Sequence, residues 1–120
     1  MLETAFALTM TRVHDGTFSL GTLIKSLTSA PVRAWDLDKR TGLSGLGTLA
    51  PGAPADLVIF DPDMEWTVDV GDFRSKGKNT PLEGRTLKGK VLVTISEGEI
   101  MHADSTVAGR LRLTDRNEGT

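Results

Sequence analysis

The feature that most limits the fold of this chain is a change in hydrophobic period near residue 45. Before that point, apolar residues recur at helical spacing in residues 2–13 and 20–27, and a third short helix is expected around Pro31, since proline suits a first helical turn. Beyond it, short apolar runs alternate with turn residues, which is typical of strands. Helices followed by strands predict an α+β fold rather than an alternating α/β fold.

Local residues indicate where the helices end and begin. Asp15-Gly16 is expected to end the first helix, because glycine adopts the left-handed conformation without strain. Ser19 is expected to cap the second helix with its hydroxyl. Residues 38–47 are rich in glycine and predict a connector between the helical part and the strands.

The second part of the chain predicts strands and tight turns. Residues 57–60, Leu-Val-Ile-Phe, are continuously apolar, so we expect a strand that is covered on both faces and ends at Asp61-Pro62. Residues 90–102 predict a hairpin with its turn at Glu97-Gly98. Further expectations are a strand before the Pro51-Gly52 turn, a short strand at residues 65–68 with Trp66 and Val68 on one face, a helical turn at residues 69–73 and a loop at residues 74–84.

These patterns divide the chain into three segments. Residues 1–45 form a helical segment, residues 46–104 a β-rich segment, and residues 105–120 a polar tail that we expect to be loosely ordered. A length of 120 residues is enough for one domain with a modest core.

Charge and composition narrow the classes of function. The formal net charge is −2, which gives no electrostatic case for binding nucleic acid or an anionic membrane. The chain has no run of 18 apolar residues, and its start lacks the basic-then-apolar order of a signal peptide. With no cysteine, disulfides, thiolate chemistry and cysteine-ligated zinc are excluded, and a cytoplasmic location fits.

Asp56 and Asp61 flank the apolar run and invite comparison with a pair of catalytic carboxylates. Five positions of extended strand separate their α-carbons by roughly 16 Å, and the odd offset directs the two side chains to opposite faces. A catalytic pair must sit closer together. We therefore interpret both aspartates as acceptors for backbone amides in turns.

Four other sets of residues resemble parts of known kinds of site. His14 and His102 lie 88 positions apart and form no local metal motif, so surface or half-buried positions are expected. The loop "SKGKNTP" lacks the second glycine and the following helix of a phosphate-binding P-loop. Lys25-Ser26 lies in an apolar helical stripe that explains it without a serine–lysine nucleophile. His102 and Asp104 are close in sequence, a spacing common by chance. The residues alone therefore assign no catalytic, cofactor-binding or metal-ligating residue.

The ordered set of motifs resembles the C-terminal part of the dihydroorotases, which are metal-dependent amidohydrolases. The resemblance covers residues 2–102. The stretch "GTLAPGAPADLVIFDP" is similar to many amidohydrolases, and the loop "SKGKNTPLEG" at residues 75–84 is more particular to dihydroorotases. The opening "LETA" at residues 2–5 also resembles that family, although Met1 stands where a glycine is usual.

This resemblance implies the last helices of a (β/α)₈ barrel at residues 1–45, followed by the C-terminal share of the family's β-sandwich. It implies hydrolysis of a cyclic amide, interconverting dihydroorotate and carbamoyl aspartate in pyrimidine synthesis, with zinc as the metal of the complete enzyme. The family's ligands are a His-x-His pair, a carboxylated lysine, two histidines and an aspartate, and all lie upstream of the matched region. No metal or catalytic role is therefore carried over to any residue here, and the chain alone is predicted to be inactive.

The resemblance also implies partners. Strands that lack their neighbours should expose apolar faces or unpaired edges, so we expect the chain to bind a missing N-terminal barrel portion or to self-associate. Two alternatives remain open at this point. The chain could be a non-catalytic β-rich interaction module, or a fragment of a hydantoinase- or allantoinase-type amidohydrolase.

Overall fold

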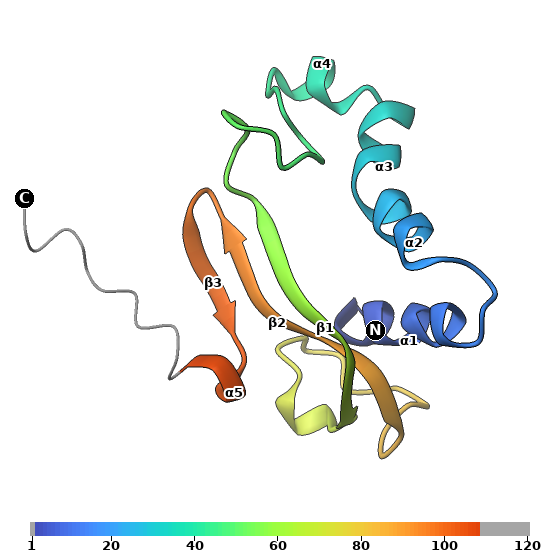
Figure 1. Cartoon of the computed structure of the whole chain (residues 1–120). Helices are drawn as coiled ribbons and strands as arrows, with labels where there is room; N and C mark the ends of the chain where they lie inside the picture. The colour runs from blue at the N-terminus through green and yellow to red at the C-terminus, as the bar shows by residue number, and fades with distance from the viewer. Residues whose placement is uncertain (1, 109–120) are drawn as a thin grey trace, which may run out of the picture.

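The computed structural model describes residues 2–108 and shows helices followed by an antiparallel sheet, which confirms the α+β prediction (Figure 1). The elements in chain order are α1 (Leu2–His14), α2 (Leu20–Leu27), α3 (Ser29–Ala34), α4 (Leu37–Thr41), β1 (Leu57–Thr67), the 3-10 turn η1 (Val70–Asp72), β2 (Thr86–Ser96), β3 (Glu99–Ala103) and α5 (Ser105–Ala108).

The predicted helix boundaries are confirmed. After α1 the chain turns at Gly16, whose φ of 82° is in the left-handed region. The Ser19 hydroxyl accepts the Thr22 backbone N–H at 3.1 Å and so caps α2. Pro31 lies in the first turn of α3, where its missing N–H leaves no hydrogen bond unmade. Helix α4 was not predicted, because its sequence reads as a polar connector.

The sheet has three strands in the order β1-β2-β3, and both pairings are antiparallel. The predicted hairpin is confirmed as β2 and β3, and β2 begins four residues earlier than expected, at Thr86. Its turn residues, Glu97 and Gly98, have φ values of 51° and 80°. Positive φ at both positions is the geometry of a type I′ turn, which matches the twist of the flanking strands. The predicted helical turn is η1.

Two strand predictions are wrong. Strand β1 does not end at Pro62 but continues to Thr67, because Pro62 lies in the register irregularity between Asp61 and Glu65, where no ladder N–H is needed. The short strand expected from residue 65 is therefore the end of β1. The strand expected before Pro51-Gly52 is also wrong. There the Ala53 N–H bonds to Ala50 O at 3.0 Å, a turn contact in place of a strand ladder.

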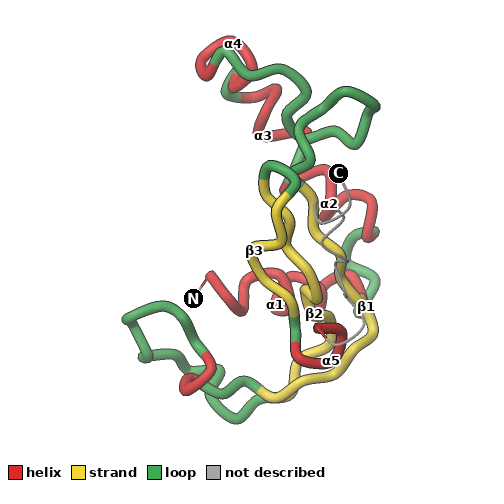
Figure 2. The backbone as a smooth tube through the Cα atoms, turned by 90° about the vertical axis from the view of Figure 1, so that its left-hand side faces the viewer, coloured by secondary structure: helices red, strands yellow, loops and turns green. Residues whose placement is uncertain are grey.

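The expectation that β1 is covered on both faces is wrong as well. Val58 is 51% exposed and Ile59 is 47% exposed. Helix α1 packs on β2, whereas both views show α3 and α4 reaching beyond the hairpin end of the sheet (Figures 1 and 2). A continuous apolar run indicates that a strand is suited to burial. Within residues 2–108, however, other parts of the chain cover only some of the apolar side chains of β1.

The core is small and lies where α1 meets the lower half of the sheet. It contains a cluster of buried side chains from α1, the residues flanking η1, the loop at residues 74–84 and β2, namely Ala7, Val68, Phe73, Leu82 and Leu87. The radius of gyration is 16.5 Å, larger than the roughly 14 Å of a compact domain of this length. Outside the core, large apolar side chains such as Leu27, Trp35 and Leu49 are exposed.

The three-segment division stays a prediction. Of the polar tail, residues 105–108 form α5. Residues 109–120, including the alternating "RLRLTDR" stretch, lie outside the described residues.

Candidate functional site

Two segments far apart in the sequence meet at the carboxylate of Glu3, in the first turn of α1. The Arg74 backbone N–H donates to Glu3 Oε1 at 2.7 Å, and the Ser75 hydroxyl donates to Glu3 Oε2 at 2.8 Å. The Ser75 backbone N–H lies 3.4 Å from the same Oε2. These donors, the Arg74 amide first, hold the pKa of Glu3 below its usual range because they stabilise the charged form. The beginning of α1 is thus fixed to the beginning of the loop predicted at residues 74–84.

That loop is held by its own contacts as well. Phe73 and Leu82 are buried and pack with Ala7 of α1. The Gly84 N–H donates to Val68 O at 2.9 Å, which closes the base of the segment. Lys78 Nζ donates to the Phe73 carbonyl across the loop. The loop is therefore structured, with the buried side chains of Phe73 and Leu82 fixing its two ends.

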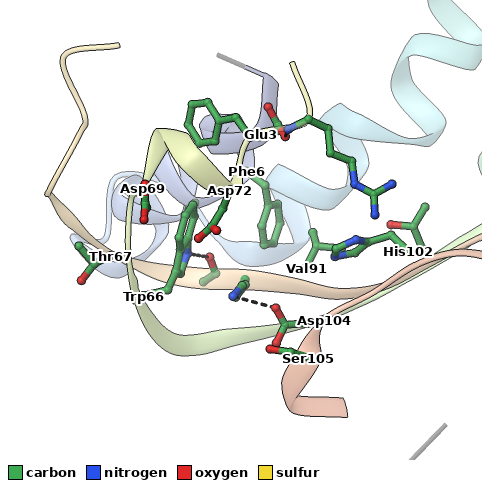
Figure 3. Close-up of a pocket in the computed structure, with 16 residues that line it drawn as sticks. Glu3, Phe6, Trp66, Thr67, Asp69, Asp72, Val91, His102, Asp104 and Ser105 are labelled. Carbon is green, nitrogen blue, oxygen red and sulfur yellow. Dashed lines mark hydrogen bonds and ion pairs between the residues drawn. The ribbon is translucent and has the colours of Figure 1, made fainter. Parts of the chain in front are cut away.

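A cavity of about 610 Å³ opens beside this loop, between α1 and the sheet (Figure 3). Its lining includes Glu3 and Phe6 from α1, Trp66 from β1 and His102 from β3. Figure 3 shows the rings of Trp66 and Phe6 between Asp69 and His102. This is the size of many small-molecule sites, but its lining mixes acids and bases instead of converging on one chemistry.

An ion pair at the cavity ties the residue after β3 to β2. Lys90 Nζ lies 2.8 Å from Asp104 Oδ1 and 5.7 Å from the centre of the Trp66 ring. The Thr106 hydroxyl donates to Asp104 Oδ2 at 2.6 Å. The Lys90 hydrogen bond, followed by that of Thr106, lowers the pKa of Asp104 to about 2. Asp104 is therefore a structural anion, engaged by Lys90 and Thr106, and it does not orient His102.

The two histidines lie in different places and do not form a site. His14 Nε2 lies 2.8 Å from the Pro62 carbonyl, so this nitrogen carries the proton and donates it. His102 is half-buried on β3 and lines the cavity. Within residues 2–108, no three histidine, aspartate or glutamate side chains are grouped so that they could hold a metal ion.

Asp56 and Asp61 bind backbone amides, as predicted. Asp56 Oδ1 accepts the Glu97 N–H at 2.7 Å and so supports the hairpin turn. Asp61 Oδ1 accepts the Asp63 N–H at 2.9 Å, across Pro62. The Ser26 hydroxyl donates to Thr22 O at 2.8 Å within α2, which uses its proton in the helix. These residues are explained by local structure.

Glu3 is the residue that sequence reasoning missed. Its partner lies 71 positions away, so no spacing rule could join the two. The available signal was that "LETA" and the loop at residues 75–84 both belong to the same family resemblance.

A second cavity is an apolar groove that lies over the other end of the sheet. It has a volume of about 790 Å³ and is formed by α2, residues 47–49, the start of β1 and the end of β2. Ile24, Leu49, Val58 and Ile59 are among its walls. Leu49 is 81% exposed, so this groove presents uncovered hydrophobic side chains.

Comparison with known proteins identifies relatives over most of the chain. Residues 1–101 match the model of the family described as "Amidohydrolase family". A protein named dihydroorotase from Syntrophus aciditrophicus (strain SB) is 42% identical over 103 residues, which is 86% of this chain and 22% of the relative. The dihydroorotase of Aquifex aeolicus (strain VF5) is 41% identical over 86% of this chain and 23% of its own length. The chain thus spans less than a quarter of the curated relatives it matches. Among residues 2–108, no helix has the length and apolar character needed to cross a membrane.

Proposed function

Because the chain belongs to the amidohydrolase family, we propose that it supplies the part of a dihydroorotase-type enzyme that carries no metal ligand. In this proposal residues 1–45 are the last helices of a (β/α)₈ barrel and residues 46–104 are the C-terminal share of the accessory sandwich. Hydrolysis of the cyclic amide would require the barrel portion, and this chain alone would be inactive.

The observation that carries the proposal is the combination of partial-length similarity with uncovered apolar surface. About 40% identity to dihydroorotases extends over 86% of the chain but reaches only 22–23% of two of the relatives. Of the groove walls, Leu49 is 81% exposed, and Val58 and Ile59 are each about half exposed. Side chains of this type stabilise a fold by roughly 1.5–3 kcal/mol each when fully covered. The exposed apolar surface calls for a partner that covers it. The relatives contain additional chain that could provide this cover, so both observations support the proposal.

Zinc does not fit the residues at hand. Cysteine is absent from the sequence, and the part of the chain that the structure describes brings no three potential ligands together. In the complete enzyme the metal would supply polarisation of the amide carbonyl and an activated water. No step of that reaction is assigned to residues of this chain, whose proposed role is to complete and support the fold.

The proposed partner is the barrel portion, and its proposed docking surface is the apolar groove between α2 and β1. The hydrophobic walls would be covered by the partner's apolar side chains. Self-association through the same groove is the expected behaviour when the barrel portion is missing, because the same apolar surface would then be buried between copies. A cytoplasmic location stays a prediction.

The names of the relatives and the Ser75–Gly84 loop favour a dihydroorotase over a hydantoinase or allantoinase. A free-standing interaction module would bind something other than the barrel. It would also fold without exposing the groove.

The test is complementation. The chain is assayed with dihydroorotate and zinc, alone and co-expressed with the Syntrophus aciditrophicus relative from which the matching region has been removed. We expect activity only in the mixture, together with co-purification of the two parts. Activity of the chain alone, or failure of the parts to associate, would contradict the proposal.

A matched pair of variants locates the contact. Ile59→Lys places a charge in the groove and should lower co-purification and activity together. Glu99→Lys makes a charge change at an exposed position beside the hairpin turn and should leave both unchanged. Equal effects of the two substitutions would place the contact elsewhere.

A further inference from the structure

The donors that surround Glu3 form an arrangement suited to a carboxylate. Two consecutive backbone N–H groups, of Arg74 and Ser75, and the Ser75 hydroxyl all point at its two oxygens, at 2.7, 3.4 and 2.8 Å. Successive amides that converge on one anion are a recurrent anion-binding unit in proteins. Glu3 itself is exposed, so these donors hold it in place and burial does not.

The charge around the donors has the sign that a carboxylate needs. Lys78 contributes favourably to the ionised form of Glu3. Arg74 and Lys76 are exposed in the same loop and carry further positive charge. The loop lacks the second glycine and the following helix of a phosphate-binding P-loop. It nevertheless binds an anion, and that anion comes from the chain itself.

The donors are held in place by contacts that do not involve Glu3. Phe73, just before them, is buried in the core cluster. Two hydrogen bonds join the residues before the loop to its end. The Val70 N–H donates to Glu83 Oε2 at 2.8 Å, and the Gly84 N–H donates to Val68 O at 2.9 Å. The two amides should therefore keep their direction when the Glu3 carboxylate is removed.

We propose that Arg74 and Ser75 form a carboxylate-binding site whose resident ligand is Glu3, and that the site takes a small external carboxylate when Glu3 leaves it. In the unsubstituted chain the tether gives Glu3 an effective concentration on the order of millimolar or more, so an external anion competes poorly. Release of the first turn of α1 and binding of an external carboxylate are then mutually linked. This inference does not depend on the proposed enzyme function.

The experiment uses the full chain with Glu3→Ala and sodium acetate as the probe. Backbone ¹⁵N–¹H spectra are recorded during titration, with sodium chloride at equal ionic strength as the reference. We expect saturable shifts at the Arg74 and Ser75 amides and a higher melting temperature in acetate than in chloride. The unsubstituted chain should show neither effect.

Two controls separate a site from a general salt effect. Glu3→Ala combined with Ser75→Ala loses one donor and should weaken acetate binding by roughly 5- to 10-fold, the value of one hydrogen bond. Glu83→Ala removes the carboxylate that accepts the single Val70 N–H, so acetate should produce no saturable shift at Val70.

The outcomes decide the proposal in either direction. Absence of a saturable shift at Arg74 and Ser75, or equal shifts in chloride, would overturn it. If Glu3→Ala disorders the loop, the same acetate titration of that variant is followed by the recovery of the loop's amide dispersion. Recovery in acetate supports the site, and no recovery refutes it.

Discussion

Gly89 of β2 lies directly against Met10 of α1, with no space for a side chain between them. A Cβ built on Gly89 would lie 3.0 Å from Met10 Cγ and 3.2 Å from Met10 Cβ. The φ of Gly89 is 113°, a conformation that residues with a side chain rarely adopt. Met10 is only 1% exposed, and the Gly89 carbonyl accepts the Trp66 indole N–H at 2.9 Å. One glycine thus lets helix, strand and indole approach each other.

The first prediction follows from this contact. Gly89→Ala should lower the free energy of unfolding by about 2–3 kcal/mol, because it adds both backbone strain and overpacking against Met10. Urea denaturation followed by tryptophan fluorescence measures the change. Gly77→Ala is the matched control, since a Cβ there meets nothing within 4 Å, and it should change stability by less than about 0.5 kcal/mol. Equal effects of the two substitutions would argue against the contact.

The second prediction concerns acid stability. The folded-state pKa of Asp104 is lowered from 3.8 to about 2, so the unfolded chain binds the proton more readily. The stability this provides, up to about 2 kcal/mol, is present above pH 4–5 and is lost as the pH falls toward 2. Asp104→Asn should flatten this part of the curve of unfolding free energy against pH. Asp63→Asn, at an exposed position of β1, should leave its shape unchanged.

The third prediction concerns the hairpin turn. Glu97 has a φ of 51° without being glycine, and asparagine tolerates this conformation better at a type I′ turn. Glu97→Asn should raise the free energy of unfolding by about 0.5 kcal/mol, since the backbone N–H that binds Asp56 is retained. Thermal and urea unfolding check the gain. Glu99→Asn lies just beyond the turn in β3, and a similar gain there would contradict the conformational explanation.

The fourth prediction tests whether the groove wall is uncovered in the isolated chain. Val58→Thr and Ile59→Thr should cost less than about 1 kcal/mol together, because both side chains are about half exposed and threonine suits a strand. Self-association, measured by sedimentation velocity, should fall. Val93→Thr, at the buried partner position of Ile59, should cost about 1–3 kcal/mol. A comparable cost at Val58 and Ile59 would show that these two positions are already covered.

Predictions from the sequence succeeded where neighbouring residues determine the outcome. The Ser19 cap, the turn at Gly16 and the Glu97-Gly98 hairpin each depend on residues a few positions apart. The same holds for Asp61, whose carboxylate binds an amide two residues along the chain. The course of β1 through Pro62 could not be predicted, because a strand interior tolerates proline only where its partner strand leaves a gap in the ladder.

The sequence by itself determined the order of helices followed by strands and the amidohydrolase resemblance, since periodicity and motif order are properties of the chain read along its length. The tertiary structure alone decided that Glu3 binds the Ser75 loop, that Gly89 receives Met10 and that Val58 and Ile59 face outward. Each of these depends on which surfaces meet. An apolar side chain specifies that it gains from burial, but only the packed structure determines whether another part of the chain is there to cover it.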